Sequence, residues 1–288
     1  MQASSYRMIR SGAALCGLVL WAILPAAAQQ KKALNILNAA LLEAEDGFAA
    51  SPDTVYQPGE TIYLSFHIQG YTVDRNSRLK LAYIIDALDF KGVPFVESEA
   101  GKIDTELSPQ DAKWSPRVRF SASLPPFADS GKYRLLMRVT DELARTQASQ
   151  EMQFQVRGRN VEPSATLVVR NFQFSRQEDG NPLPVAAYRR GDTLWASFDI
   201  TGYQTGEKNL VWVEYDLSVF DAENKLLYAQ PQPAEDKATS FYPRRYVHAV
   251  FSLNLESAIP PGEYTIVLVV RDRLGNQTLE TGQKFSIE

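Results

Sequence analysis

The sequence is poor in the side chains that carry covalent and metal chemistry. It has a single cysteine, Cys16, and two histidines, His67 and His248. No glycine-rich phosphate loop, no His-Glu-x-x-His pattern and no Gly-x-Ser-x-Gly pattern occurs in it. We therefore expect no catalytic residue, no metal site and no cofactor, and a protein that is not an enzyme.

Long blocks of like charge are missing as well. The chain carries 30 lysines and arginines against 34 aspartates and glutamates, a net charge of −4. Nucleic acids and anionic membrane surfaces attract proteins through basic patches or stripes. The even, mildly acidic distribution predicts neither partner, and the hydrophobic fraction of 44% is that of an ordinary globular protein.

Residues 1–28 show the three parts of a secretory signal peptide. Arg7 and Arg10 make the start basic, an apolar run follows over 12–24, and three alanines at 26–28 are typical of a cleavage site. An uncleaved membrane anchor is the alternative interpretation. The apolar run is shorter than the roughly 20 residues that a spanning helix needs, so we expect cleavage.

Lipid attachment at Cys16 is a second alternative for the same segment. Leu15 disfavours it, because a small residue is required before a lipidated cysteine. Cleavage removes Cys16 and leaves a mature chain without disulfides. It also leaves 28 basic and 34 acidic residues, a net charge of −6. We expect a periplasmic or secreted protein with no membrane span.

The remaining chain contains one unit twice. Segments 56–71 and 188–203 are identical at half of their sixteen positions, at an offset of 132. Weaker matches continue along both copies at offsets of 131 to 133. Such a repeat predicts two copies of one domain. We place domain 1 at 33–157 and domain 2 at 164–288, joined by a short polar linker.

Both copies have the periodicity of β-strands, with apolar residues alternating and Gly, Pro, Asn and Asp at the turns. Segment 34–45 has a composition compatible with a helix. Its counterpart over 167–174 alternates and is β-branched, so we predict a strand in both. About seven short strands per copy, with no helical period, predict an all-β fold. That fold is two tandem Ig-like antiparallel β-sandwich domains after the signal peptide.

The stretch DSGKYRLLMRVTD, which contains Tyr133, resembles the start of strand F in immunoglobulin-type sandwiches. In that family a tyrosine bonds back to the preceding turn, two residues before a cysteine. Tyr133 and Tyr264 match the tyrosine, and Leu135 and Ile266 stand where the cysteine would be. The departure is similar to disulfide-free bacterial Ig-like and fibronectin type III-like modules, and YQPGETIYLSF resembles an early strand of macroglobulin-type domains. The resemblance implies a sandwich and says little about function.

One strand face of domain 2 carries apolar residues where polar ones are expected. Val267 and Val269 lie between the core positions of their strand, and Trp212 shares its side of the neighbouring strand with Glu214 and Asp216. If these strands adjoin, Trp212, Val267 and Val269 form an exposed apolar patch, which usually marks a partner surface. Alternatively, Trp212 is a core tryptophan reached through a one-residue bulge.

Two further features are compatible with binding. Tyr63 and Trp195 occupy equivalent positions on the polar face of a strand, where they form either a sugar-stacking platform or a cross-strand pair that stiffens the sheet. Each copy also has a long segment rich in proline and charge, 92–116 and 224–243, which we expect to be a loop. Such a loop either binds a partner or crosses between sheets with its aromatic residues against the sandwich end.

These observations favour a non-catalytic exported binding or structural module. We expect protein–protein interaction or adhesion at the cell envelope, with another envelope or extracellular protein as the partner. The alternative is a carbohydrate-binding module that holds a polysaccharide on exposed aromatic rings. The candidate partner-binding residues are Trp212, Val267, Val269, Trp195 and Tyr63.

Overall fold

The computed structural model describes residues 33–111, 113–178 and 180–288. The predicted signal peptide, 1–28, lies outside the described residues. Residues 33–288 form one compact unit. In the described ranges no helix is long and apolar enough to cross a membrane, and the only helical elements there are two three-residue 3-10 turns, η1 (Pro109–Asp111) and η2 (Glu207–Asn209).

Residues 33–157, the first half, form two sheets. One has the order β1-β3-β6 and the other β2-β8-β7-β4-β5. All pairings are antiparallel except the two-residue pairing of β2 with β8. The strands are β1 (Asn35–Leu42), β2 (Val55–Tyr56), β3 (Thr61–Gln69), β4 (Arg78–Leu88), β5 (Glu99–Glu106), β6 (Arg117–Ser123), β7 (Gly131–Asp141) and β8 (Thr146–Val156).

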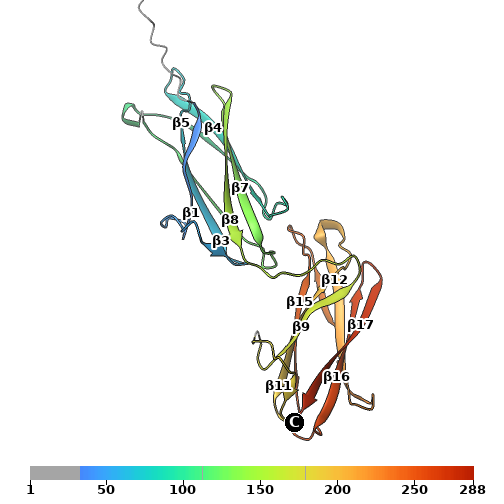
Figure 1. Cartoon of the computed structure of the whole chain (residues 1–288). Coiled ribbons are helices and arrows are strands. Elements are labelled where there is room, and N and C mark those ends of the chain that lie inside the picture. Colours follow the sequence, from blue (N-terminus) through green and yellow to red (C-terminus); the bar gives the residue numbers. More distant parts are fainter. Residues whose placement is uncertain (1–32, 112, 179) are drawn as a thin grey trace, which may run out of the picture. The chain divides into compact units, whose positions relative to one another are not determined.

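Residues 164–288, the second half, have the same strand order. Figure 1 labels β9, β11, β12, β15, β16 and β17 of this half. One sheet runs β9-β11-β15 and the other β10-β17-β16-β12-β13, with β14 also paired to β12. The all-β sandwich expected from the sequence is confirmed. The strands are β9 (Val168–Ser175), β10 (Ala187–Tyr188), β11 (Thr193–Thr201), β12 (Val211–Phe220), β13 (Leu226–Ala229), β14 (Ala234–Ala238), β15 (Val247–Asn254), β16 (Gly262–Asp272) and β17 (Gln277–Ile287).

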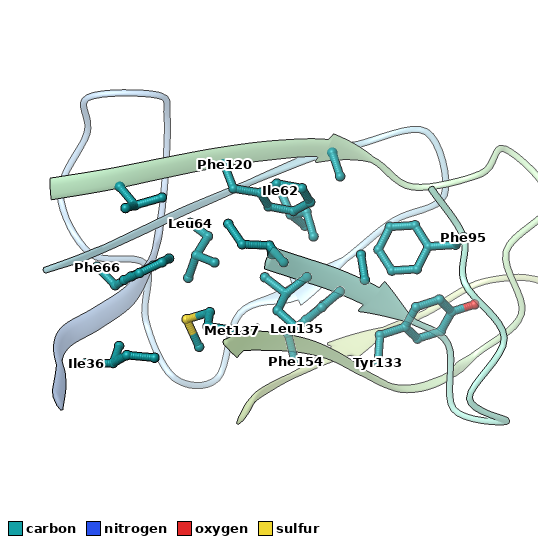
Figure 2. Close-up of a cluster of buried hydrophobic side chains, with 14 of the residues drawn as sticks. Ile36, Ile62, Leu64, Phe66, Phe95, Phe120, Tyr133, Leu135, Met137 and Phe154 are labelled. Atoms are coloured by element: carbon teal, nitrogen blue, oxygen red, sulfur yellow. The ribbon is translucent and has the colours of Figure 1, made fainter. Parts of the chain in front are cut away.

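The core of each half lies between its two sheets, because alternate side chains of a strand point to the same face. In the first half, Leu64 and Phe66 of β3 meet Leu135 and Met137 of β7, and all four are almost wholly buried (Figure 2). In the second half, β11 and β16 supply the equivalent positions, such as Phe198 and Leu268. Disulfides are not needed where apolar burial of this kind holds the sheets together.

The strands predicted over 34–45 and 167–174 are confirmed as β1 and β9. Each is interrupted at an asparagine with a left-handed backbone, Asn38 at φ +52° and Asn171 at φ +50°, where the pairing register shifts. Asparagine tolerates this conformation better than other non-glycine residues do. The match between the two asparagines therefore reflects a β-bulge present in both halves.

The segments predicted as long loops contain strands instead, and that prediction is wrong. Residues 92–116 include β5, and 224–243 include β13 and β14. Strands β5 and β14 carry few apolar residues, and the four residues of β13 are all exposed, so none of the three shows the alternation by which a strand is recognised. The segments are crossovers whose strands extend a sheet.

Candidate functional site

The two corner tyrosines lie where the resemblance to Ig-type strands places them. Tyr133 and Tyr264 are buried, and their hydroxyls donate to the carbonyls of Asp129 (3.1 Å) and Pro260 (2.6 Å) in the preceding turns. The predicted tyrosine corner is confirmed in both halves. Each tyrosine also forms part of a surface at the end of its half.

At the end of the first half, the surface around Asp89, Phe127, Asp129 and Tyr133 is covered by residues of the second half. We call this surface the filled socket. The ring of Tyr242 packs within the core cluster of the first half and lies stacked on Phe127, with 6.0 Å between ring centroids. The second half thus completes the core of the first.

Asp89 anchors this contact although the residue is only 1% exposed. Its Oδ1 accepts the backbone N–H groups of Lys91 and Val93, both at 2.8 Å. Its Oδ2 accepts the Tyr242 hydroxyl at 2.7 Å and Arg245 Nη2 at 2.8 Å. Burial opposes ionisation, but these four donors hold the pKa of Asp89 below its usual value.

Other contacts hold the two halves together at the filled socket. Arg245 also forms an ion pair with Asp129 and lies over the ring of Phe90. The linker is fixed against the same turn, since Ser130 donates to the Gly158 carbonyl at 2.8 Å. A Cβ at Gly158 would lie 1.8 Å from the carbonyl oxygen of Ala128, so only glycine permits this approach. These contacts join the linker and Arg245 to the turn that ends the first half.

The second half has the same surface at its own end, and there it is open. The turn at Asp221 matches the turn at Asp89 bond for bond: Asp221 Oδ1 accepts the N–H groups of Glu223 (3.1 Å) and Lys225 (2.8 Å). Backbone bonds join Asp221 to Lys225 and to Asn224, as they join Asp89 to Val93 and to Gly92. Burial and the charges of Asp221 and Glu223 raise the pKa of Tyr264, the corner tyrosine of the second half.

Val219 and Leu227, which flank this turn in the chain, line a hollow of about 360 Å³ whose lining is mainly apolar. We call the hollow together with the Asp221 turn the open socket. Leu227 (47% exposed) and Tyr228 (41%) line it, and the equally exposed Leu226 (52%) directly precedes them in β13. In the described part of the chain, Asp221 Oδ2 has no hydrogen-bond partner. Its equivalent in the first half, Asp89 Oδ2, holds Tyr242 and Arg245. Other lining residues include Val219, Leu253, Leu255, Ile259, Tyr264, Phe285 and Ile287.

The exposure of these three residues has a local cause. The first half lines the edge of β4 with one continuous strand, β5, whereas the second half lines β12 with two short strands, β13 and β14. Pro231 and Pro233 fall between β13 and β14, and proline cannot donate a ladder hydrogen bond. The break leaves β13 as a four-residue edge strand in which every residue is exposed.

The predicted patch on β12 and β16 is placed on the outward face. Strands β12 and β16 pair without a bulge, so Trp212 is not a core residue reached by a register slip. Trp212, Val267 and Val269 are half-buried. Glu214 and Asp216 alternate with Trp212 along β12 and form ion pairs with arginines of β16 and the turn after it. These charges lie between Trp212 and the two valines, so the three residues do not form one continuous apolar patch.

The indole of Trp212 is covered by β14. Lys237 Nζ lies 3.5 Å from the ring centroid, and Trp212 and Lys237 are partners in the strand pairing. In the described residues the indole N–H has no acceptor. The ring is therefore partly enclosed by its own sheet, and its role in binding stays a prediction.

Tyr63 and Trp195 are both half-buried on three-stranded sheets. Trp195 stands between Ser175 and Ser252 on its neighbouring strands, and Tyr63 stands between Leu42 and Ser121. They lie in different halves, and the structure does not bring them together into one platform. Their proposed role in stacking sugars stays a prediction.

One polar cluster was missed by the sequence reasoning. Asp199 is wholly buried, and His248 Nδ1 lies 2.8 Å from its Oδ1, while Asn171 Nδ2 donates to its Oδ2 at 2.8 Å. Burial raises the pKa of Asp199, but these hydrogen bonds and the charge of Arg159 together hold it below the usual value. No sequence signal identifies this cluster, because the first half has His67 and Arg117 at the positions of Asp199 and His248.

The His248–Asp199 pair has the spacing of a catalytic dyad but not its chemistry. The second ring nitrogen of His248 faces Arg159 Nη2 at 3.4 Å, where a hydrolase would present a nucleophile. In residues 33–111, 113–178 and 180–288 no group of three or more His, Cys, Asp or Glu side chains is placed to hold a metal ion. The cluster fixes the linker residue Arg159 to the second half.

A larger hollow of about 630 Å³ lies at the junction and is lined by Arg157, Arg159 and Arg244. Arg244 forms a two-pronged ion pair with Asp236, at 2.7 and 2.6 Å, and Arg159 pairs with Asp199. Because acidic side chains of the chain itself already balance Arg159 and Arg244, we assign no ligand to this hollow.

No protein-family model matches the sequence, and no curated protein sequence matches it. Among solved structures, the C-terminal domain of the Streptococcus agalactiae antigen I/II polypeptide BspA is 9% identical, covering 88% of this chain and 99% of its own, with a TM-score of 0.31. The C-terminal domain of the Streptococcus pyogenes antigen I/II-family protein AspA is 9% identical, covering 90% and 99%, with a TM-score of 0.33. Likeness at this level carries no argument about fold or function.

Proposed function

We propose that the protein is a non-catalytic protein-binding module of the cell envelope, and that the open socket is its binding surface. The observation that carries the proposal is the row of exposed side chains Leu226, Leu227 and Tyr228 beside an apolar hollow. Contiguous apolar surface with a polar rim is characteristic of partner sites on exported and soluble proteins.

The edge position of β13 adds a second reason. Its outer backbone groups are not paired within the described sheet, because β13 is the last strand of the order β10-β17-β16-β12-β13. An edge strand can pair with an extended segment of a partner, while pockets beside it select side chains. The open socket therefore offers both backbone pairing and an apolar pocket.

The test is a pull-down from the native envelope fraction with the full chain as bait. Leu227→Ser and Tyr228→Ser should remove a specific partner that the unaltered chain captures, because each deletes apolar contact area at the centre of the surface. Val185→Ser is the matched control, since Val185 is 72% exposed and lies outside the open socket. A partner that survives both socket changes would contradict the proposal.

Export to the periplasm or the outside of the cell belongs to the same proposal, and it rests on the signal-like segment 1–28. The candidates predicted from the sequence, Trp212, Val267, Val269, Trp195 and Tyr63, remain secondary. They would gain priority if a polysaccharide, rather than a protein, bound the chain and Trp195→Ala abolished that binding.

We also propose that 33–157 and 164–288 are separate domains. Each half has its own two sheets and its own buried clusters, although Tyr242 completes the first core. Polypeptides 30–160 and 161–288 should each show β-type circular dichroism and a cooperative unfolding transition. The first should melt below its transition in the whole chain, because it lacks Tyr242. If either half fails to fold alone, the division is wrong.

A further inference from the structure

We infer that the open socket takes a partner loop that carries a tyrosine and an arginine, as the filled socket takes Tyr242 and Arg245. This inference rests on the proposed function and names the chemistry of the partner. The occupant is a loop of another protein that presents a phenol hydroxyl and a guanidinium side by side. The filled socket is the starting point, because there the chain itself shows the occupant that this surface accepts.

The two acceptors are equivalent. Asp89 and Asp221 each use Oδ1 to close their own turn, which leaves Oδ2 for an outside donor. In the filled socket that oxygen accepts both Tyr242 and Arg245. An unpaired carboxylate oxygen at the same position in the open socket favours the same kind of donor, since hydrogen bonds between ionised partners are the strongest available.

The charge around the open socket favours the same donor. Glu223 lies in the Asp221 turn, Glu256 lines the hollow, and Glu263 directly precedes Tyr264 in β16. Lys225 is the one basic residue of the Asp221 turn. Lys284 already pairs with Glu263 at 4.0 Å, and Arg189 and Arg190 precede the loop that bonds to Leu255. Glu223 and Glu256 therefore carry the argument, since negative charge beside Asp221 favours a basic loop over an acidic one.

The space available suits an aromatic side chain. The filled socket contains Phe90 and Phe127, and the matching positions of the open socket are Ala222 and Ala258. Ala258 lines the hollow of about 360 Å³, so the smaller residue at that position leaves room for a ring. The volume suits one aromatic ring with part of its loop, because drug-sized pockets begin at about 300 Å³.

A second copy of this chain does not supply such a loop from its free end. The loop of the first half that corresponds to 239–247 joins β5 to β6 and contains Asp111, Lys113 and Trp114, with no tyrosine or arginine before β6 begins. Asp111 would bring a like charge to Asp221. Loop 239–247 itself is engaged at the filled socket. The partner is therefore a different protein.

The probe is a head-to-tail cyclic peptide with the sequence of residues 239–247, TSFYPRRYV, carrying a fluorescent label. In the protein this loop is held rigid by Asn209, Tyr203 and Thr201, which donate to its carbonyls, so cyclisation reproduces a preorganised state. Binding to the full chain is followed by fluorescence anisotropy. A matched peptide carries phenylalanine in place of Tyr242 and alanine in place of Arg245. It tests whether binding depends on the phenol hydroxyl and the guanidinium.

We expect saturable binding of one peptide per chain. Asp221→Asn and the altered peptide should each weaken binding about tenfold or more, the size expected for losing a charged hydrogen bond. Glu280→Gln is the control, since it removes one exposed acidic charge on β17 away from the socket.

Three results would overturn the inference: no saturable binding, binding that Asp221→Asn leaves unchanged, or equal binding of a cyclic peptide of residues 108–116, which would favour a second copy. Any of them leaves the proposed function standing if Leu227→Ser still removes the envelope partner. If Leu227→Ser also leaves the capture of the envelope partner unchanged, both this inference and the proposed function are overturned.

Discussion

The turns at Asp89 and Asp221 have the same backbone hydrogen bonds and opposite surroundings. Asp89 is 1% exposed beneath Tyr242 and Arg245, whereas the Asp221 turn is flanked in the chain by Val219 and Leu227, which line a hollow. The same turn thus holds the two halves together in the filled socket and leaves an exposed surface in the open socket. An end of this sandwich is therefore built to receive a loop, and it stays open in the second half because no further half packs against it in the described chain.

The contrast has an energetic meaning. A buried carboxylate is costly unless charged and polar donors surround it, and breaking one such contact costs more than forming it gains. Substitutions at Asp89 in the filled socket should therefore lower stability, because this carboxylate is buried and both of its oxygens are paired. The same substitution at Asp221 alters a partly exposed group and should hardly affect folding.

The largest expected effect is at the corner tyrosines. Tyr133→Ala should lower the free energy of unfolding by about 3–5 kcal/mol, because it opens a cavity among Phe95, Phe154 and Tyr242. Tyr264→Ala should cost less, since its ring borders the open socket, where solvent already enters. Urea unfolding followed by circular dichroism measures both. The Phe variants should each lose about 1 kcal/mol, the net value of one hydrogen bond, and equal losses for the two alanine variants would contradict the comparison.

The next effect is at the two aspartates themselves. Asp89→Asn should cost about 1–3 kcal/mol, because it leaves Arg245 with a weaker acceptor in a buried site. Asp221→Asn should change stability by less than about 0.5 kcal/mol, as is usual for surface positions. Thermal unfolding of the two variants side by side is the measurement. A larger loss for Asp221→Asn would mean that the second half depends on its turn in the same way.

Much of this architecture could be predicted from the sequence because the core residues obey a simple period. The alternation in β3, β11 and β16 follows from burial on one face, and Tyr133 and Tyr264 stand at fixed places in strands that recur. The sequence identifies Asn38 and Asn171 only as matching residues. The reason for the match, a left-handed bulge, is a backbone property that residue types express only indirectly.

The candidate site could not be predicted, for two physical reasons. Edge strands β5, β13 and β14 carry little apolar alternation, so their segments resemble loops. The contact of Tyr242 with Asp89 joins residues 153 positions apart, and both are ordinary loop residues by type. Periodicity marks Trp212 and the two valines instead, although ion pairs separate them in space.

Acid should weaken the contact between Asp89 and the second half. The folded-state pKa of Asp89 lies below its usual 3.8, so its contribution to stability is fully present above pH 3.8 and is lost as the pH falls through the folded value. Asp199 behaves in the same way in the second half. Urea unfolding from pH 7 down to about pH 2.5 should therefore show a loss of stability that starts below about pH 4. Asp89→Asn should flatten that dependence, and a curve unchanged by it would show that this carboxylate does not titrate with folding.

The smallest expected effect is at Trp212, on the sheet face away from both sockets. The ring lies on the outward face of β12, where it contacts Lys237 at 3.5 Å, and an exposed cation–π contact is worth about 0.5–1 kcal/mol. Trp212→Ser should therefore lower the free energy of unfolding by about 1 kcal/mol. Lys237→Ala tests the same contact from the other side and should give a similar loss, whereas a loss of several kcal/mol for Trp212→Ser alone would place the ring in the core. Capture of the envelope partner should survive both changes, because the partner is expected at Leu227 and Tyr228. If Trp212→Ser removed the partner and Leu227→Ser did not, the binding surface would lie on β12 rather than at the open end of the sandwich.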